Sequence, residues 1–304
     1  MKRIAFVING AANGIENLKR ELSKKLHGHE VLFSETSYAG EAPHLAQKLM
    51  EDNVDYLIAV GGDGSLNEVV NGCMNTPDLI SKDTIIGVLP HGSGNDFARS
   101  LGITKDIDQL KTLINENCTR PVDVGLLRFM DQNGLEASRY FINITDVGIG
   151  GVAAKMLNKS SRFMGASFTY HKVILQSFFS YKPVKVALKS NDYNWKGEIL
   201  SLCMANGRYF ANGMCIAPKA NISDGKIQLV IMGKVSIMDY ILNLSKIKKG
   251  IPLEHPEVTY IKVGACTIEA EENTCPIDMD GEFIGYAPLK LTVIKNKLKF
   301  LNAD

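Results

Sequence analysis

The chain has 304 residues and a formal net charge of +1, and 45% of its residues are hydrophobic. This length suffices for two domains that each bury a core. The near-zero charge argues against a nucleic-acid partner, and it excludes adhesion to anionic membranes by global charge alone. No apolar run reaches the ~18 residues that span a bilayer, and the apolar stretch before Asn9 is too short for a signal peptide. We therefore expect a soluble, cytoplasmic protein.

The six cysteines are scattered along the chain, and none forms a CxxC pair or lies at zinc spacing from a histidine. Reduced thiols in a cytoplasmic protein explain this pattern better than a disulfide framework or a metal–thiolate site.

In roughly the first 125 residues, apolar runs of strand length alternate with helical patterns. The predicted strands are Arg3–Ile8, Val31–Phe33, Tyr56–Val60 and Thr84–Leu89, and the helices between them include one that ends near Leu26 and one at Ala42–Met50. This alternation favours a parallel sheet with helices on both faces. In such sheets, ligands bind beyond the carboxyl ends of the strands.

The third predicted strand runs into Gly61-Gly62-Asp63-Gly64-Ser65, directly before a helical pattern. Glycines allow the backbone to approach a ligand closely, and the amides at the start of a helix suit a phosphate. Asp63 would repel a phosphate unless a divalent cation lies between them or the acid handles a proton. The loop therefore indicates chemistry at a phosphate, but a plain turn capped by Ser65 also fits these residues.

A second small-residue loop, Pro90-His91-Gly92-Ser93-Gly94-Asn95-Asp96, follows the fourth predicted strand. Two loops at neighbouring strand ends can face one ligand.

Past Asp123 the sequence changes to short β-rich runs separated by turn signals. These runs are Arg139–Ile144, Val184–Leu188, Glu198–Met204, Ile227–Ile231, Val258–Val263 and Leu289–Ile294. Helical patterns interrupt them at about Met164–Phe179 and at Ile237–Ile247. We expect an antiparallel sandwich in this half of the chain.

The two loops, read as GGDGSLNEVVNG and PHGSGNDFARSLGI, together resemble the catalytic-domain signatures of the diacylglycerol kinase and sphingosine kinase superfamily, in particular its bacterial soluble lipid kinases. Later segments follow the order and spacing of that family. They are Asn206-Gly207-Arg208, Ala211-Asn212-Gly213, Pro218, Ser223-Asp224-Gly225 and Asp280-Gly281-Glu282.

The resemblance implies an α/β nucleotide-binding domain, similar to those of phosphofructokinases and NAD kinases, and a mostly β sandwich domain, with the active site in the cleft between them. The last strand of relatives often returns to the first domain. We therefore expect residues 1–125 plus 295–304 to form the ATP-binding domain, and residues 126–294 to form the substrate domain.

By the same resemblance, the protein is expected to be a Mg²⁺-dependent lipid kinase that transfers the γ-phosphate of ATP to a hydroxyl of diacylglycerol or a related lipid. The sequence contains no Walker lysine motif, so Mg²⁺ is expected to neutralise much of the triphosphate charge. The implied nucleotide-binding residues are Asn9, Thr36, Gly61, Gly62, Asp63, Gly64, Ser65, Asn67, Glu68 and Ser93.

Glu282 matches the family's proton acceptor for the lipid hydroxyl, and Asp63 is the rival base, as in NAD kinases. The resemblance also implies a metal site formed by the Asp224 carboxylate and the carbonyls of Asn221 and Lys226, with Asp96 and Asp123 linked to it through water. For Glu282 and Asp224 alike, a plain turn remains the competing interpretation.

The chain also departs from the family. The first loop, Asn9–Gly14, has no basic residue, for which Lys19 or Arg20 are candidate replacements, and the glycine-rich segment Asp146–Gly151 lacks an acid seen in many relatives, so it is assigned no role.

A lipid substrate requires an apolar groove and transient contact with a membrane surface. Candidates for the groove are Phe163, Met164, Phe168, Phe178 and Phe179, and candidates for the membrane face are Ile237, Tyr240, Ile241 and Leu244 beside Lys246, Lys248 and Lys249. Both sets fit ordinary core packing and a solvated helix end equally well.

The alternatives are an NAD kinase-like phosphotransferase, a dinucleotide oxidoreductase and a non-catalytic lipid or nucleotide sensor, and a homodimer is left open. The oxidoreductase is disfavoured because no GxGxxG follows the first strand.

Overall fold

The computed structural model of the chain describes residues 1–76, 84–157, 166–271 and 275–303. It divides into two compact units. Unit 1 comprises Met1–Val122 and Asn296–Asp304, and unit 2 comprises Asp123–Lys295. The chain passes between them inside two strands, β5 (Thr119–Asp131) and β17 (Glu282–Leu301). Among the described residues, no helix is both long and apolar enough to cross a bilayer.

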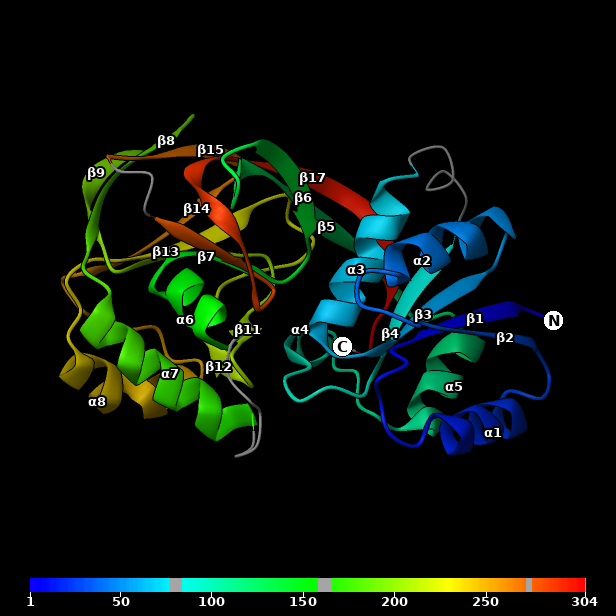
Figure 1. Cartoon of the computed structure of the whole chain (residues 1–304). Helices are drawn as coiled ribbons and strands as arrows, with labels where there is room; N and C mark the ends of the chain where they lie inside the picture. Colours follow the sequence, from blue (N-terminus) through cyan, green and yellow to red (C-terminus); the bar gives the residue numbers. More distant parts are fainter. Residues whose placement is uncertain (77–83, 158–165, 272–274, 304) are drawn as a thin grey trace. The chain divides into compact units, whose positions relative to one another are not determined.

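Unit 1 is built on a parallel sheet in the order β2-β1-β3-β4-β17. The first four strands are β1 (Arg3–Ile8), β2 (Glu30–Glu35), β3 (Tyr56–Gly61) and β4 (Ile85–Pro90). The helices are α1 (Ile15–Lys25), α2 (Ala42–Glu51), α3 (Asp63–Met74), α4 (Asp96–Ser100) and α5 (Ile107–Glu116). Helices α2 and α3 pack together on one face of the sheet, and α1 and α5 pack on the other (Figure 1).

The central strands of unit 1 are buried along their whole length. Every residue of β3 and β4 is buried, as expected for parallel strands that helices cover on both faces. The part of β17 in unit 1 completes this core, because Phe300 is fully buried and its ring packs edge-on against that of Phe97.

Unit 2 is mostly antiparallel. One run of strands has the order β14-β13-β10-β7-β16-β17, and β17 also pairs with β15, which continues through β8 to β9. The strands not yet given are β6 (Glu136–Phe141), β7 (Ile144–Gly148), β8 (Val184–Ser190), β9 (Asn194–Ile199), β10 (Ser201–Ala205), β11 (Tyr209–Phe210), β12 (Met214–Cys215), β13 (Ile227–Met232), β14 (Val258–Val263), β15 (Ala265–Ala270) and β16 (Pro276–Met279).

Three helices, α6 (Ile149–Leu157), α7 (Ala166–Ser180) and α8 (Ile237–Lys248), gather at one side of unit 2 (Figure 1). Helix α6 packs against α7 and against β16. Helix α8 begins with a capping box, in which Ser236 Oγ accepts from the N–H of Asp239 and the Asp239 carboxylate accepts from the N–H of Ser236.

The predicted fold class, an α/β nucleotide-binding domain followed by a mostly β domain, is confirmed. Helix α6 was not predicted, because its first residues Ile149, Gly150 and Gly151 combine an apolar run with glycines that normally disfavour helices.

Candidate active site

The two glycine loops of unit 1 lie directly against each other. The N–H of His91 donates to the carbonyl oxygen of Gly61 at 2.8 Å. A Cβ atom added at Gly92 would lie 2.4 Å from the Cα of Gly62, so any side chain there would force the backbones apart. The contact follows from the sheet order, because β3 and β4 are neighbouring parallel strands whose carboxyl ends meet at one edge.

The Asp63 side chain links these two loops through hydrogen bonds. It is the first residue of α3, and its two carboxylate oxygens accept from the N–H groups of Asp96, at 3.1 Å, and Phe97, at 3.0 Å. Those N–H groups open α4 and would otherwise lack intrahelical partners. The acid of the glycine loop is therefore a structural clamp in this structure.

The Asn9–Gly14 loop lies beside the Gly61–Ser65 loop. Asn9 Nδ2 lies 3.4 Å from Ser65 Oγ, and the N–H of Gly10 donates to Thr36 Oγ1 at 3.0 Å. A Cβ atom added at Gly61 would lie 2.4 Å from Ser65 Oγ. Asn9, Thr36, Gly61 and Ser65 are thus brought to one edge of the sheet.

The other residues that are predicted to bind the nucleotide differ in their exposure to solvent. Ser93 is exposed, Gly62, Gly64 and Glu68 are half-buried, and Asn67 is fully buried. The Asn67 Oδ1 accepts from Asn71 Nδ2 one turn further along α3, at 3.0 Å.

The proposed substitutes for the missing basic residue are engaged elsewhere. Lys19 forms ion pairs with Glu16 and Glu35. Arg20 donates to the side chain of Asn17 and to the carbonyl of Glu16. The N-terminal end of α3 and its backbone N–H groups still favour an anion at the loops.

In unit 2, the loop around Asp224 is drawn toward Asp123. Asp123 is fully buried, its Oδ2 accepts from the N–H of Gly225 at 2.5 Å, and its own N–H donates to the carbonyl of Ile222 at 2.6 Å. Asp224 Oδ1 accepts from the N–H of Lys226 at 3.0 Å. The other oxygen of Asp224 pairs with Lys262 Nζ at 2.6 Å.

The structure brings Asp123, Asn221, Asp224 and Lys226 together. Asn221 Oδ1 accepts from the N–H of Ser223 at 3.1 Å, which shapes the same loop. Asp96, the other predicted member of this metal network, is buried in unit 1.

Glu282 begins β17 just after a tight turn. Asp280 and Gly281 both have positive φ, of 49° and 89°, as expected for the two central residues of a two-residue hairpin turn. The turn is fixed to β7, because Asp280 Oδ1 accepts from the N–H of Ile144 at 3.0 Å. The Glu282 carboxylate is 42% exposed and pairs with Arg139 at 2.7 Å. The Arg139 and Lys262 partners were not predicted, because both are distant in the chain from the acids with which they pair.

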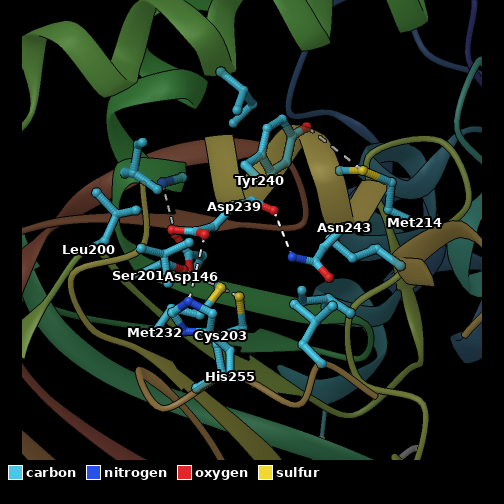
Figure 2. A pocket seen from close by; sticks show the side chains of 18 of the residues that line it. Asp146, Leu200, Ser201, Cys203, Met214, Met232, Asp239, Tyr240, Asn243 and His255 are labelled. Atoms are coloured by element: carbon cyan, nitrogen blue, oxygen red, sulfur yellow. Dashed lines mark hydrogen bonds and ion pairs between the residues drawn. The ribbon is translucent and has the colours of Figure 1, made fainter. Parts of the chain in front are cut away.

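An apolar pocket of about 80 Å³ lies in unit 2 beside α7, α8 and β10 (Figure 2). Phe178, one of the residues predicted to form a lipid groove, lines it and packs against Tyr240 with ring centroids 5.7 Å apart. Phe179 instead faces solvent and is 83% exposed. Phe163, Met164 and the side chain of Phe168 lie outside the described residues.

Asp146, to which the sequence assigned no role, lies at this pocket (Figure 2). Its carboxylate accepts from the hydroxyl of Ser201, from the thiol of Cys203 at 3.1 Å and from the N–H of Gly150 at 2.8 Å. Burial raises the pKa of Asp146 to about 6, although these donors oppose the rise. A lone acid inside the apolar run Ile144–Gly148 was the signal for such a group.

A second acid, Asp278, lies opposite Asp146 in the β7–β16 pairing. Its Oδ1 is buried and has no hydrogen-bond partner among the described residues. Burial, followed by the charge of Asp146, raises the pKa of Asp278 well above its usual value. Burial and the nearness of the two carboxyls therefore both disfavour the ionised form of Asp278.

Residues 3–127 match the family described as the diacylglycerol kinase catalytic domain, and residues 143–302 match the YegS C-terminal NAD kinase beta sandwich-like domain. A diacylglycerol kinase of Staphylococcus carnosus is 30% identical over 305 residues, which cover 98% of this chain and 95% of that relative. This chain belongs to the diacylglycerol kinase family.

Another relative and two solved structures are also similar to this chain. A diacylglycerol kinase of Bacillus subtilis is 30% identical over 297 residues, covering 95% of this chain and 92% of that protein. The crystal structure of a putative diacylglycerol kinase from Bacillus anthracis matches with a TM-score of 0.76 and 21% identity, over 99% of this chain and 97% of that one. Yeast NADH kinase has the same fold, with a TM-score of 0.56 and 9% identity, over 100% of this chain and 84% of that one. The predicted family and enzyme class, a phosphotransferase with an alcohol acceptor, are confirmed.

Replacing Asp63 by alanine tests the clamp between the loops. The variant leaves the N–H groups of Asp96 and Phe97 without their acceptor, so we expect the free energy of unfolding of unit 1 to fall by about 1–3 kcal/mol. Urea denaturation measures this change. Glu51→Ala, which removes an exposed carboxylate from the same unit, is the matched control. Equal midpoints for the two variants would contradict the clamp.

Asp146→Asn tests the buried carboxyl. Because the folded state raises this pKa from 3.8 to about 6, the group contributes stability that is present below pH 4 and is lost as pH rises through 6. Asparagine does not ionise, so we expect the variant to gain about 2 kcal/mol relative to the parent between pH 4 and 7.5. Urea titrations at both pH values measure this gain, with the exposed Asp192→Asn as control. A stability difference that is independent of pH would show that Asp146 stays ionised.

Proposed function

We propose that the protein is an ATP-dependent lipid kinase that transfers the γ-phosphate to a hydroxyl of diacylglycerol or a related lipid. The observation that carries the proposal is the apolar pocket of unit 2, the unit that also bears Glu282. A pocket walled mainly by apolar side chains suits a hydrocarbon chain better than a polar dinucleotide. The relatives named diacylglycerol kinase support the same class of acceptor.

The nucleotide would bind at the paired glycine loops of unit 1. The N-terminal end of α3 and the close approach that Gly62 and Gly92 allow favour phosphate groups at this edge. Ser65, Ser93 and Asn9 would supply hydroxyl and amide contacts. Asp63, whose oxygens accept from two N–H groups of the second loop, would keep the two loops in register while phosphate binds.

The acceptor hydroxyl would lose its proton to Glu282 as its oxygen bonds to the γ-phosphorus and the bond to the ADP oxygen breaks. In a loose transition state the proton leaves late, so a positioned carboxylate is basic enough for this role. Arg139, 2.7 Å from Glu282, orients the carboxylate. Asp63 remains the rival base.

Mg²⁺ would neutralise the charge of the triphosphate. The described residues contain no group of three or more His, Cys, Asp or Glu side chains that could hold a metal ion. The Asp224 loop nevertheless offers the hard oxygens that Mg²⁺ prefers, and Mg²⁺ usually takes only one or two carboxylates. The Asp224 carboxylate already attracts one cation, the ammonium of Lys262, at 2.6 Å. The donor set therefore fits Mg²⁺, which the Asp224 carboxylate and the carbonyls of Asn221 and Lys226 would hold.

Thin-layer analysis of transfer from labelled ATP to a panel of diacylglycerol, sphingoid bases and NAD tests the proposal. We expect label in a lipid and none in NAD, because the pocket that favours the acceptor is apolar. Transfer to NAD alone would establish the NAD kinase alternative. The absence of any transfer, with nucleotide and lipid still bound, would establish a sensor.

Glu282→Gln tests the base. We expect kcat to fall by ~10²-fold or more while lipid binding is retained, because glutamine keeps the shape but cannot take the proton. Steady-state kinetics with diacylglycerol measure kcat and KM separately. Glu136→Gln changes an exposed acid of the same unit and should leave both constants unchanged. An unchanged kcat in Glu282→Gln would transfer the role to Asp63.

A further inference from the structure

His91 links the Pro90–Asp96 loop to the Asn9–Gly14 loop. Its ring nitrogen Nε2 lies 3.2 Å from the carbonyl oxygen of Asn13. Because a carbonyl oxygen only accepts, Nε2 carries the hydrogen and donates it. The backbone N–H of the same residue donates to the carbonyl oxygen of Gly61 at 2.8 Å. A single residue therefore contacts the loops at the ends of both β1 and β3.

The order of the strands places this side chain across the end of β3. We call Asn9–Gly14, Gly61–Ser65 and Pro90–Asp96 the three loops. They follow β1, β3 and β4, and β3 lies between the other two strands (Figure 1). The strands on the two sides of β3 are about 10 Å apart, which is two strand spacings. The bond between His91 and Asn13 therefore crosses the end of β3, at the edge where the phosphates of the nucleotide are proposed to bind.

His91 is the one residue of the three loops that can carry a positive charge. The acidic residues of these loops are Asp63 and Asp96. Lys19 and Arg20, which follow the first of the loops along the chain, bind other groups. Carboxylates repel a phosphate unless a cation compensates the charge. Of the side chains in the three loops, that of His91 can provide this compensation.

The imidazole of His91 has a second nitrogen to offer. The three loops are already joined without this ring, by the Asp63 carboxylate and by the contact of Asn9 with Ser65. The Nδ1 atom of His91 has no hydrogen-bond partner among the described residues. A protonated imidazole keeps the bond to Asn13 through Nε2 and can donate from Nδ1 to an anion.

We propose that His91 is a nucleotide-binding residue, and that its imidazolium donates from Nδ1 to a phosphate of the nucleotide. The inference rests on the proposed binding of ATP at the three loops. It gives His91 the positive charge that the Asn9–Gly14 loop lacks. Because the contact is to a phosphate, it strengthens the binding of ATP and leaves the binding of adenosine unchanged.

The test is titration calorimetry of the full chain with ATP and excess Mg²⁺, and with adenosine, in the absence of lipid. His91→Gln keeps an N–H that can donate to Asn13 but carries no charge. We expect its Kd for ATP to rise ~10-fold or more, because a charge-assisted hydrogen bond is lost. His91→Lys restores a positive charge and should recover most of this affinity. The Kd for adenosine should be the same in all three proteins.

His27→Gln is the matched control. His27 is another exposed histidine of unit 1, and its ring Nδ1 lies 3.1 Å from a backbone carbonyl oxygen, that of Lys24. This variant should bind ATP like the parent protein. Urea midpoints equal to that of the parent exclude misfolding as the cause of lost affinity.

Three results would overturn the role of His91. The first is a Kd for ATP that His91→Gln leaves unchanged. The second is an equal loss of ATP affinity in His91→Gln and His91→Lys, because the charge would then not matter. The third is an equal rise in the Kd values for ATP and adenosine, because the side chain would then not act on a phosphate.

Lipid phosphorylation separates this inference from the proposed function. ATP binding that depends on His91, without transfer of phosphate to any lipid, would uphold the inference and refute the lipid kinase. Transfer to diacylglycerol, with the same ATP affinity in the parent and in His91→Gln, would uphold the kinase and refute the role of His91. A parent protein that does not bind ATP would refute both.

Discussion

The contact between the Gly61–Ser65 loop and the Pro90–Asp96 loop is the constraint on which the site of unit 1 depends. Two backbones meet there with no side chain between them, at Gly62 and Gly92, and the Asp63 carboxylate holds them together through two N–H groups. Such a site is formed before any ligand arrives. Donors fixed in advance need little reorganisation when charge develops on a phosphate, and this is the main source of catalysis in phosphoryl transfer.

The acidic side chains of unit 2 lie in two different environments. Two acids pair with cations, Glu282 with Arg139 and Asp224 with Lys262. Those pairs are half-exposed, so a ligand can exchange for either partner at modest cost. Asp146 and Asp278 have no ion pair among the described residues, and burial raises the pKa of both carboxyls. The half-exposed carboxylates of unit 2 thus form ion pairs, whereas the environment of the two buried carboxyls disfavours their ionised form.

The sequence predicted the fold class and the neighbouring glycine loops, because alternating strand and helix patterns determine which strand ends lie together. It did not predict how side chains are used within a loop. The sequence did not indicate that the Asp63 oxygens accept from the Asp96 and Phe97 amides, and the expected role of Asp63 toward a metal or a proton stays a prediction. The same limit explains Tyr240 and Ile241, which adjoin in sequence yet lie on different faces of α8. Partners distant in the chain, such as Arg139, leave no local signal.

Strand β17 has a consequence for biosynthesis. It gives its first part to unit 2, and its later part, beginning at Asn296, lies beside β4 in the sheet of unit 1. Phe300, which fills the core beneath Phe97, is translated only after the whole of unit 2. On the ribosome, the first unit to emerge would therefore wait with an open sheet edge and an unfilled core until the end of β17 is made.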